Sequence, residues 1–403
     1  MAAPLGYSAP SGSPGRMIAN GLFGESCVDR IELPQVQCSL LKDARHGRKN
    51  YLQMSLQGGR KGYPVKHAIC AFLISGTIGF LTQTAVDGIT FATWNIANLH
   101  HETGVSLRNR SVAREDADYA RLAATAERLD ADVVALQEIG SPAALERIFS
   151  SANYHLIVSD RYVPGDEARP PKERDIFTAL AVSKVTFPEL PDVKTVSAFA
   201  LQHIELTSDR TAESIRPTRA AMQIEFEHEG RKISFLNVHL KSSCHQYSLR
   251  DVEDQHFVNK KPFGSRFDCR TLKAQLAILE NWIEVKHALG RHVVVAGDFN
   301  RRLNRFYRNP TRHEDFWAEL NDGTPGGLDL SKGPEDSDSV CWPSHKKRFE
   351  EHIDLIVADN ALLQSFATVK FEKLGLGHDD APEYADRNRE RLSDHCPVVL
   401  RLE

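Results

Sequence analysis

The 403-residue sequence predicts an α/β fold in which strands outnumber helices and the elements pack in layers. Short runs of β-branched and aromatic residues recur from residue 89 to residue 402, and stretches with helical periodicity lie between them. The residues best suited to chemistry fall at or just beyond the ends of these runs. This combination is typical of a functional site built at one edge of stacked sheets.

The first elements alternate between strand and helix. A strand is expected from Ile89 to Trp94, and residues 112–130 should form an amphipathic helix, because apolar residues recur there at helical spacing, at Tyr119, Leu122, Ala126 and Leu129. The next buried strand, Val133 to Leu136, follows this helix directly. A helix followed so closely by a strand implies layered helices and sheets.

Strands dominate the remaining chain. They are expected at Ile176–Val182, Ala220–Phe226, Ile233–His239, Val293–Ala296, Ile353–Val357 and Pro397–Leu402. A second helix should end near Gly290, a plausible C-cap, since apolar residues at helical spacing precede it, at Leu272, Leu276, Leu279 and Ile283. The continuous apolar run from Val293 is typical of a strand covered on both faces.

Charge is distributed unevenly along the chain. The formal net charge is -4, but residues 1–85 hold 9 Lys and Arg against 4 Asp and Glu, which leaves residues 86–403 with a net charge of -9. An acidic body argues against tight nonspecific binding to nucleic acid. It does not exclude a nuclease, because turnover needs only a local basic groove. With 41% hydrophobic residues, the chain can bury a sizeable core.

Three regions are expected, of which residues 87–403 form the catalytic domain. Residues 54–86 read as a signal peptide, because Arg60, Lys61 and Lys66 precede an apolar run that is shorter than the roughly 20 residues of a membrane span. A membrane anchor and a buried helix are the alternatives. Residues 1–53 show no sustained periodicity, and are either a disordered extension or a mis-assigned start upstream of Met54. We therefore expect an exported protein, periplasmic or secreted, with a membrane-anchored form as the alternative.

Cysteine usage fits an oxidising compartment. Four cysteines remain after residue 86, and Cys244 and Cys269 flank a polar insertion between a strand end and a helix start. We expect these two to form a disulfide that stabilises the fold by about 3 kcal/mol. Cys341 and Cys396 are either disulfide-bonded or buried free thiols.

Six short motifs carry the chemistry, each at the end of an apolar run. In chain order they are Thr93-Trp94-Asn95, Leu136-Gln137-Glu138, Asn237-Val238-His239-Leu240-Lys241-Ser242, Gly297-Asp298-Phe299-Asn300, Ile353-Asp354-Leu355-Ile356 and Ser393-Asp394-His395. Any one of them has an ordinary structural reading, such as a solvated acid after a strand or an Asx turn. Together they supply carboxylates, two histidines and two amides, which are the groups needed to cleave a phosphate ester.

The residue types also predict individual roles. Glu138 with Asn95 nearby suits Mg²⁺, which takes one or two carboxylates and keeps several waters. Asp298 and Asn300 occupy alternate positions of an extended segment and therefore share a side. Asp354 lies in an apolar strand and needs a partner, for which an imidazole would serve as a general acid or base.

Basic residues lie beside two of these motifs. Lys241 follows His239, and a basic run follows Asn300, at Arg301, Arg302, Arg305, Arg308 and Arg312. Such a run is often a solvated helix face. Because this one begins beside the presumed phosphate site, Lys241, Arg301 and Arg302 are candidate substrate contacts.

Taken in this order, the motifs resemble the endonuclease/exonuclease/phosphatase superfamily, which includes deoxyribonuclease I and exonuclease III. The resemblance spans about residues 89–403. It implies a deoxyribonuclease I-like four-layer sandwich of two packed mixed β-sheets flanked by helices. The stretch from Cys244 to Cys269 and the helix after it resemble a bacterial exported branch of the superfamily.

The resemblance also implies roles for the site residues. Asn95 and Glu138 would hold Mg²⁺ (or Mn²⁺), with Asp394 as a further ligand. Asp298 would position or activate the attacking water, Asn300 would steady the phosphoryl oxygens, and His239 would contact the phosphate. His395 would pair with Asp354, and Glu173 would support His239.

These observations predict a metal-dependent phosphodiesterase, most simply a monomeric, exported endonuclease that acts on nucleic acid by in-line attack of water. A phosphatase or a phospholipid phosphodiesterase uses the same chemistry on a different substrate. A non-catalytic binding protein on the same fold is the remote alternative, and it would be marked by a broken motif. None of the six motifs is broken.

Overall fold

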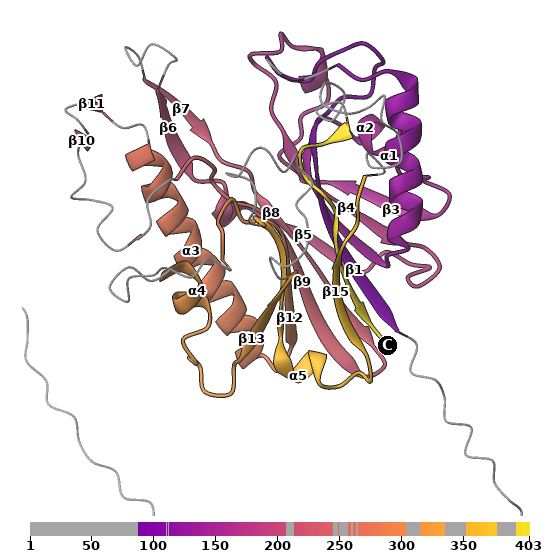
Figure 1. Ribbon diagram of the computed structural model, residues 1–403, viewed down its shortest axis with the longest axis vertical. Helices are drawn as coiled ribbons and strands as arrows, with labels where there is room; N and C mark the ends of the chain where they lie inside the picture. Colours follow the sequence, from indigo (N-terminus) through magenta and orange to yellow (C-terminus); the bar gives the residue numbers. More distant parts are fainter. Residues whose placement is uncertain are drawn as a thin grey trace, which may run out of the picture. The chain divides into compact units, whose positions relative to one another are not determined.

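A computed structural model gives the architecture of residues 88–403, apart from positions 110, 112, 207–212, 245–248, 250–256, 259–260, 263–264, 304–314, 335–351 and 377–391. Two six-stranded mixed sheets pack face to face with helices on their outer sides, which confirms the predicted α/β sandwich (Figure 1). Residues 1–53, the segment 54–86 and Cys341 lie outside the described residues. Among the helices that are described, none is both long and apolar enough to cross a membrane.

The first sheet has the strand order β15-β16-β1-β2-β4-β3. Its central pair, β1 and β2, is parallel, and the other neighbours are antiparallel. Its strands are β1 (Ile89–Leu99), β2 (Val133–Ile139), β3 (Tyr154–Val158), β4 (Phe177–Ser183), β15 (Val369–Lys373) and β16 (Val398–Leu402).

The second sheet has the order β13-β14-β12-β9-β8-β5 and again places its only parallel pair, β12 and β9, at the centre. Its strands are β5 (Asp192–Val196), β8 (Ala221–His228), β9 (Arg231–His239), β12 (His292–Asp298), β13 (Leu330–Gly333) and β14 (Asp354–Asp359). Two small ribbons complete the strands: β6 (Gln202–Leu206) with β7 (Glu213–Pro217), and β10 (Phe257–Val258) with β11 (Lys261–Pro262).

Helices cover the outer face of each sheet. On the first sheet, α1 (Asp116–Leu129) and α2 (Pro142–Glu146) bury their apolar sides against the strands. On the second sheet, α3 (Ser265–Ala288) and α4 (Asp315–Leu320) do the same, and the short α5 (Asn360–Leu363) follows β14. Helix α1 begins later than predicted because Glu115 and Asp118 form a capping box that fixes its start.

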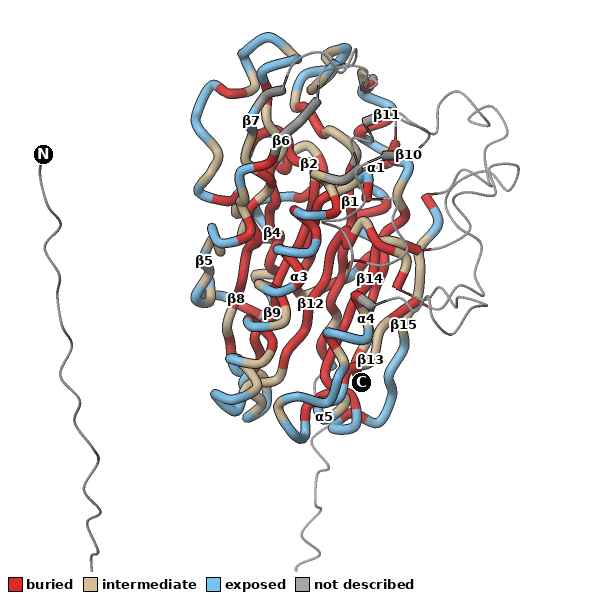
Figure 2. The backbone as a smooth tube through the Cα atoms, turned by 90° about the vertical axis from the view of Figure 1, so that its left-hand side faces the viewer, coloured by how far each residue is buried: buried red, intermediate tan, exposed pale blue. Residues whose placement is uncertain are grey.

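Alternation along the strands separates the layers. Successive side chains point to opposite faces, so one set meets the helices and the other fills the space between the sheets. Phe91 and Phe235 meet there from the two sheets, with stacked rings whose centroids are 5.4 Å apart. Figure 2 shows the buried strands running through the middle of the sandwich with exposed loops at its ends. This inner layer determines where the site lies.

The predicted disulfide between Cys244 and Cys269 is present, and it joins the chain after β9 to the first turns of α3. Cys396 is also disulfide-bonded rather than a free thiol. We expect the double substitution of Cys244 and Cys269 by serine to lower the free energy of unfolding by about 3 kcal/mol, because the unfolded chain loses a constraint. Urea unfolding at equilibrium measures this change. A change below about 0.5 kcal/mol would contradict it.

Candidate active site

The inward-facing side chains of five strands change from apolar to polar at one end of the sandwich. In β1 the series runs from Ile89 and Phe91 to Thr93 and Asn95. The same change occurs at Gln137 in β2, at Asn237 and His239 in β9, at Asp298 in β12, and at Asp354 in β14. This happens because the carboxyl ends of both central parallel pairs, together with the amino end of antiparallel β14, lie at the same end. Polar residues far apart in the sequence are thereby brought together.

A buried amide network lies below this polar end and links the two sheets. Gln137 Nε2 donates to Asn237 Oδ1 at 2.8 Å and to Thr93 Oγ1 at 3.1 Å. Asn237 in turn donates to the carbonyls of Leu136 and Ala179 in the opposite sheet. Because every buried polar group here needs a partner, the network fixes how the two sheets meet beneath the site.

Glu138 and Asn95 meet at the mouth of the site, as the sequence predicts. Asn95 Nδ2 lies 3.4 Å from Glu138 Oε1 and 3.1 Å from Asp298 Oδ2, so this buried amide links the two carboxylates. Its oxygen accepts from the amide of Ala97 at 2.9 Å. The other Glu138 oxygen accepts from the amide of Asn98 at 3.0 Å. The Asn95 side chain therefore bridges the two carboxylates and holds Glu138 beside Asp298.

The backbone is irregular at this position. Glu138 and Asn300 adopt left-handed conformations, with φ of 62° and 51°, and the register of β1 against β2 shifts between Asn95 and Leu99. Left-handed conformations of residues other than glycine cost roughly 1–3 kcal/mol each and concentrate at functional sites. Bulges likewise redirect side chains at strand ends. The left-handed backbone of Glu138, near the end of β2, places its carboxylate beside Asn95.

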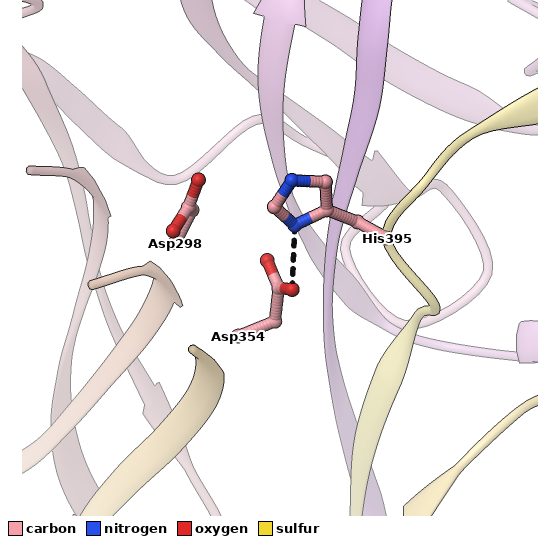
Figure 3. Close-up of side chains that lie close together, drawn as sticks. All are labelled: Asp298, Asp354 and His395. Atoms are coloured by element: carbon pink, nitrogen blue, oxygen red, sulfur yellow. Dashed lines mark hydrogen bonds and ion pairs between the residues drawn. The ribbon is translucent and has the colours of Figure 1, made fainter. Parts of the chain in front are cut away.

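His395 is held against Asp354, as predicted. Its Nδ1 lies 2.7 Å from Asp354 Oδ2, and Figure 3 shows the Asp298 carboxylate to the left of the ring, with Asp354 below it. The loop that carries the imidazole is fixed by Ser393, whose Oγ donates to the carbonyl of Asn95 at 2.7 Å and accepts from the amide of His395 at 3.0 Å. The ring is therefore preorganised before any ligand arrives.

His239 enters the same site from β9. Its Nε2 lies 3.5 Å from Asp298 Oδ2 and 3.9 Å from Glu138 Oε1. The side chain is buried, and its Nδ1 has no hydrogen-bond partner among the described residues. Two imidazoles therefore flank one carboxylate.

The two histidines are pushed toward opposite protonation states. Burial lowers the pKa of His239 well below its usual value, and the charges of Arg219 and His395 lower it further, so this ring is neutral near pH 7. Burial also lowers the pKa of His395, but the charge and hydrogen bond of Asp354 outweigh it and raise that pKa well above its usual value. Burial, followed by the charge of Asp354, raises the pKa of Asp298 to about 7. One acid and one base are thus set up within a single site.

The donor set fits a divalent cation. Potential ligand atoms of Asp298, Asp354 and His395 lie within 4.8 Å of one another, and because His395 is protonated, the two carboxylates are the members of this group that can bind a cation. The Oδ1 atom of Asp354 is buried without a partner among the described residues, and burial, followed by the charge of Asp354, raises the pKa of Asp298, so a bound cation would find two closely spaced carboxylates. Glu138 adds a further carboxylate beside Asp298. Hard oxygen donors of this kind suit Mg²⁺ or Mn²⁺.

Other predicted site residues lie at the margin or face elsewhere. Asp394 is exposed, with Oδ1 3.8 Å from His395 Nε2. Asn300 donates its backbone amide to Asp298 Oδ1 at 2.8 Å and its side chain to the carbonyl of Leu240 at 3.0 Å, so it orients Asp298. Lys241 is buried in an ion pair with Asp268 at 2.7 Å.

Two predictions need correction. The structure does not pair Glu173 with His239: Glu173 is exposed in a turn, whereas His239 is buried at the end of β9, where it lies beside Asp298 and Glu138. Arg301 is buried, with Nη1 4.0 Å from Cys244 Sγ, so it packs on the disulfide and does not line an open surface. Arg302 is half-buried, and Arg305, Arg308 and Arg312 lie outside the described residues.

Sequence reasoning missed Arg114. This buried guanidinium donates to the carbonyls of Ile96, Ala97 and Asn98 and also to that of Leu392, so it ties the irregular end of β1 to the loop that carries His395. Burial lowers its pKa to about 10, which leaves it charged. A lone arginine ahead of a helix gives no sequence signal for such a role.

Comparison with known proteins identifies the family. The model of the Endonuclease/Exonuclease/phosphatase family matches residues 92–395. The chain belongs to this family. Endonuclease/exonuclease/phosphatase proteins are hydrolases of phosphate esters that generally use divalent metals, in agreement with the polar end of the sandwich. No curated protein matched the sequence.

Several solved structures are similar to this chain at low sequence identity. An endonuclease/exonuclease/phosphatase from Bacteroides vulgatus is 16% identical, over 78% of this chain and 98% of its own, with a TM-score of 0.45. TDP2 from D. rerio in complex with a single-strand DNA product is 17% identical, over 79% and 99%, with a TM-score of 0.43. The human Nocturnin catalytic domain is 15% identical, over 78% and 94%, with a TM-score of 0.43.

Proposed function

We propose that this member of the family is an exported, metal-dependent phosphodiesterase that cuts nucleic acid strands internally. The main observation that supports this function is that Asp298 lies between a neutral His239 and a protonated His395, with Glu138 beside them. This arrangement provides a base, an acid and carboxylate ligands within one site. The disulfide between Cys244 and Cys269 supports export, because such bonds persist in oxidising compartments.

The chain's own residues account for the proton transfers of an in-line displacement. Asp298, with a pKa near neutrality, takes a proton from the attacking water as the new P–O bond forms. His395 donates its proton to the leaving oxygen as the other P–O bond breaks, while Asp354 holds the ring in place. Neutral His239 offers one N–H to a phosphoryl oxygen. Mg²⁺ or Mn²⁺ bound by Glu138 and its neighbours would polarise the phosphoryl oxygens and neutralise their charge.

Nicking of supercoiled plasmid tests this proposal. We expect the full chain, with its disulfides intact, to convert supercoiled DNA to open circles in the presence of Mg²⁺ or Mn²⁺. EDTA should abolish this activity, and Glu138→Gln should lower it by at least about 100-fold, because a neutral amide binds a hard cation poorly. Glu146→Gln in α2 is the matched control and should nick at the wild-type rate.

Two results would overturn the nuclease assignment. One is intact plasmid after incubation with folded protein that does hydrolyse a phospholipid or a small phosphate ester. The other is cleavage that persists in EDTA or in the Glu138→Gln protein, which would indicate a contaminant or a different site.

A further inference from the structure

A basic groove leads away from the site on the side of Glu138. Asn98, Arg108 and Glu138 line an opening that Lys172 borders. A second pocket shares Arg108 with this opening and is also lined by Arg161, Arg216 and Arg219. Because the two hollows share Arg108 and Ile176, they form one surface that runs from the site to a cluster of arginines.

The arginines of this groove come from three loops that the fold gathers at the polar end. Arg108 follows β1, Arg161 follows β3, and Arg219 lies between β7 and β8 beside the end of β9. Arg216 projects from β7. All four are half-buried. Arg219 and Arg108 lie near enough to His239 for their charges to act on it, so the groove and the site share one electrostatic field.

Three of the four arginines have no carboxylate partner among the described residues. No carboxylate of a described residue lies within 4.0 Å of the guanidinium groups of Arg108, Arg161 or Arg216. Arg161 donates to the carbonyl of Thr218 at 3.3 Å, and Arg216 to the carbonyl of Lys172 at 3.2 Å. Such bonds orient a guanidinium and leave its other N–H groups for an anion. Among the described residues that line the arginine pocket, Asp175 is the one acidic residue.

We propose that this groove is a second phosphate subsite, which holds a backbone phosphate next to the scissile one and so selects polynucleotides over molecules with a single phosphate. The inference rests on the proposed function. It follows because a small ester or lipid head group that places its phosphate at the metal ligands leaves the arginine pocket empty, whereas a nucleic acid strand presents phosphates at regular intervals. A locally basic groove on a body of net charge -9 also explains how an acidic protein engages such a substrate.

Binding without turnover tests the subsite directly. In EDTA, fluorescence anisotropy of a labelled single-stranded oligonucleotide measures affinity at several salt concentrations. We expect Arg161→Ala/Arg216→Ala to weaken binding by about tenfold or more and to reduce the slope of log affinity against log salt by about 1.4, the effect of two lost contacts on a single strand. Arg108→Gln, whose side chain makes no hydrogen bond to described residues, should act in the same direction at little risk to the fold.

The matched control removes the same charge elsewhere. Arg128→Ala/Lys232→Ala neutralises two exposed cations at the opposite end of the sandwich, and it should bind the oligonucleotide within about twofold of wild type. Equal affinity of the wild-type and Arg161→Ala/Arg216→Ala proteins overturns the subsite. So does binding to phosphatidylglycerol vesicles in the absence of binding to the oligonucleotide.

Turnover separates failure of the subsite from failure of the proposed function. We expect wild type to cleave a tetranucleotide with a KM at least about tenfold below that for a dinucleotide, and the double variant to lose this advantage. An advantage that survives in the variant refutes the subsite and leaves the nuclease intact. Cleavage of neither substrate refutes the nuclease, and the binding measurement still decides the subsite.

Discussion

Replacing His395 with alanine is expected to lower kcat for phosphodiester cleavage by about 100- to 10,000-fold while the protein stays folded. The imidazole of His395 is hydrogen-bonded to Asp354, and the charge of this carboxylate keeps the ring protonated. Its loss removes the proton donor for the leaving group. Single-turnover cleavage of a labelled oligonucleotide at saturating Mg²⁺ measures the chemical step directly.

A second His–Asp pair, whose aspartate also lies on β14, provides the control. His292 at the start of β12 lies 3.0 Å from Asp359 at the end of β14, so it repeats the pairing of His395 at the opposite end of the sandwich. His292→Ala should leave kcat within about twofold, because this histidine is remote from the polar end. An equal loss of kcat in the two variants would mean that His395→Ala acts by destabilising the fold. It would contradict the assignment of His395 as general acid.

The sequence predicts that these polar residues cluster, because each of them lies at the end of a strand. Apolar runs that finish in Asn95, Glu138, His239 and Asp298 place those residues at one end once the strands pair, and pairing in a two-layer sandwich leaves few alternatives. The His395–Asp354 pair was predictable for a related reason. A buried carboxylate in an apolar strand requires a partner.

What the sequence does not reveal depends on loops and backbone geometry. The turn that takes Glu173 away from His239 depends on the packing of a connecting segment, which hydrophobic periodicity does not report. The basic groove combines arginines that lie far apart in the sequence, such as Arg108, Arg161 and Arg216. No run of basic residues therefore predicts it. The more obvious run after Asn300 begins with Arg301, which is buried.

Replacing Asp298 with asparagine is expected to abolish activity and yet stabilise the metal-free protein at pH 8. Burial and the charge of Asp354 raise the pKa of Asp298 from 3.8 to about 7. At a pH between these two pKa values, the Asp298 carboxyl keeps its proton in the native state and releases it in the unfolded state. Stability of the metal-free protein therefore falls as pH rises from about 4 to about 7, by at most about 4 kcal/mol from this group.

Asparagine cannot ionise, so it avoids this loss, although it gives up the bond that Asp298 Oδ2 accepts from Asn95. The net gain at pH 8 in EDTA should be about 1 to 3 kcal/mol, measured by urea unfolding, and should vanish near pH 4. The opposite sign is expected for Asp359→Asn, because Asp359 accepts bonds from His292, Val293 and Leu362.

The effect of added Mg²⁺ on stability also distinguishes wild type from Asp298→Asn. Mg²⁺ should stabilise wild type at pH 8 and have less effect on Asp298→Asn, because the cation neutralises the charge that the substitution removes. If Asp298→Asn is instead less stable than wild type in EDTA, the carboxylate is compensated within the protein itself. That result would contradict both the raised pKa of Asp298 and the expectation that a bound cation stabilises this carboxylate.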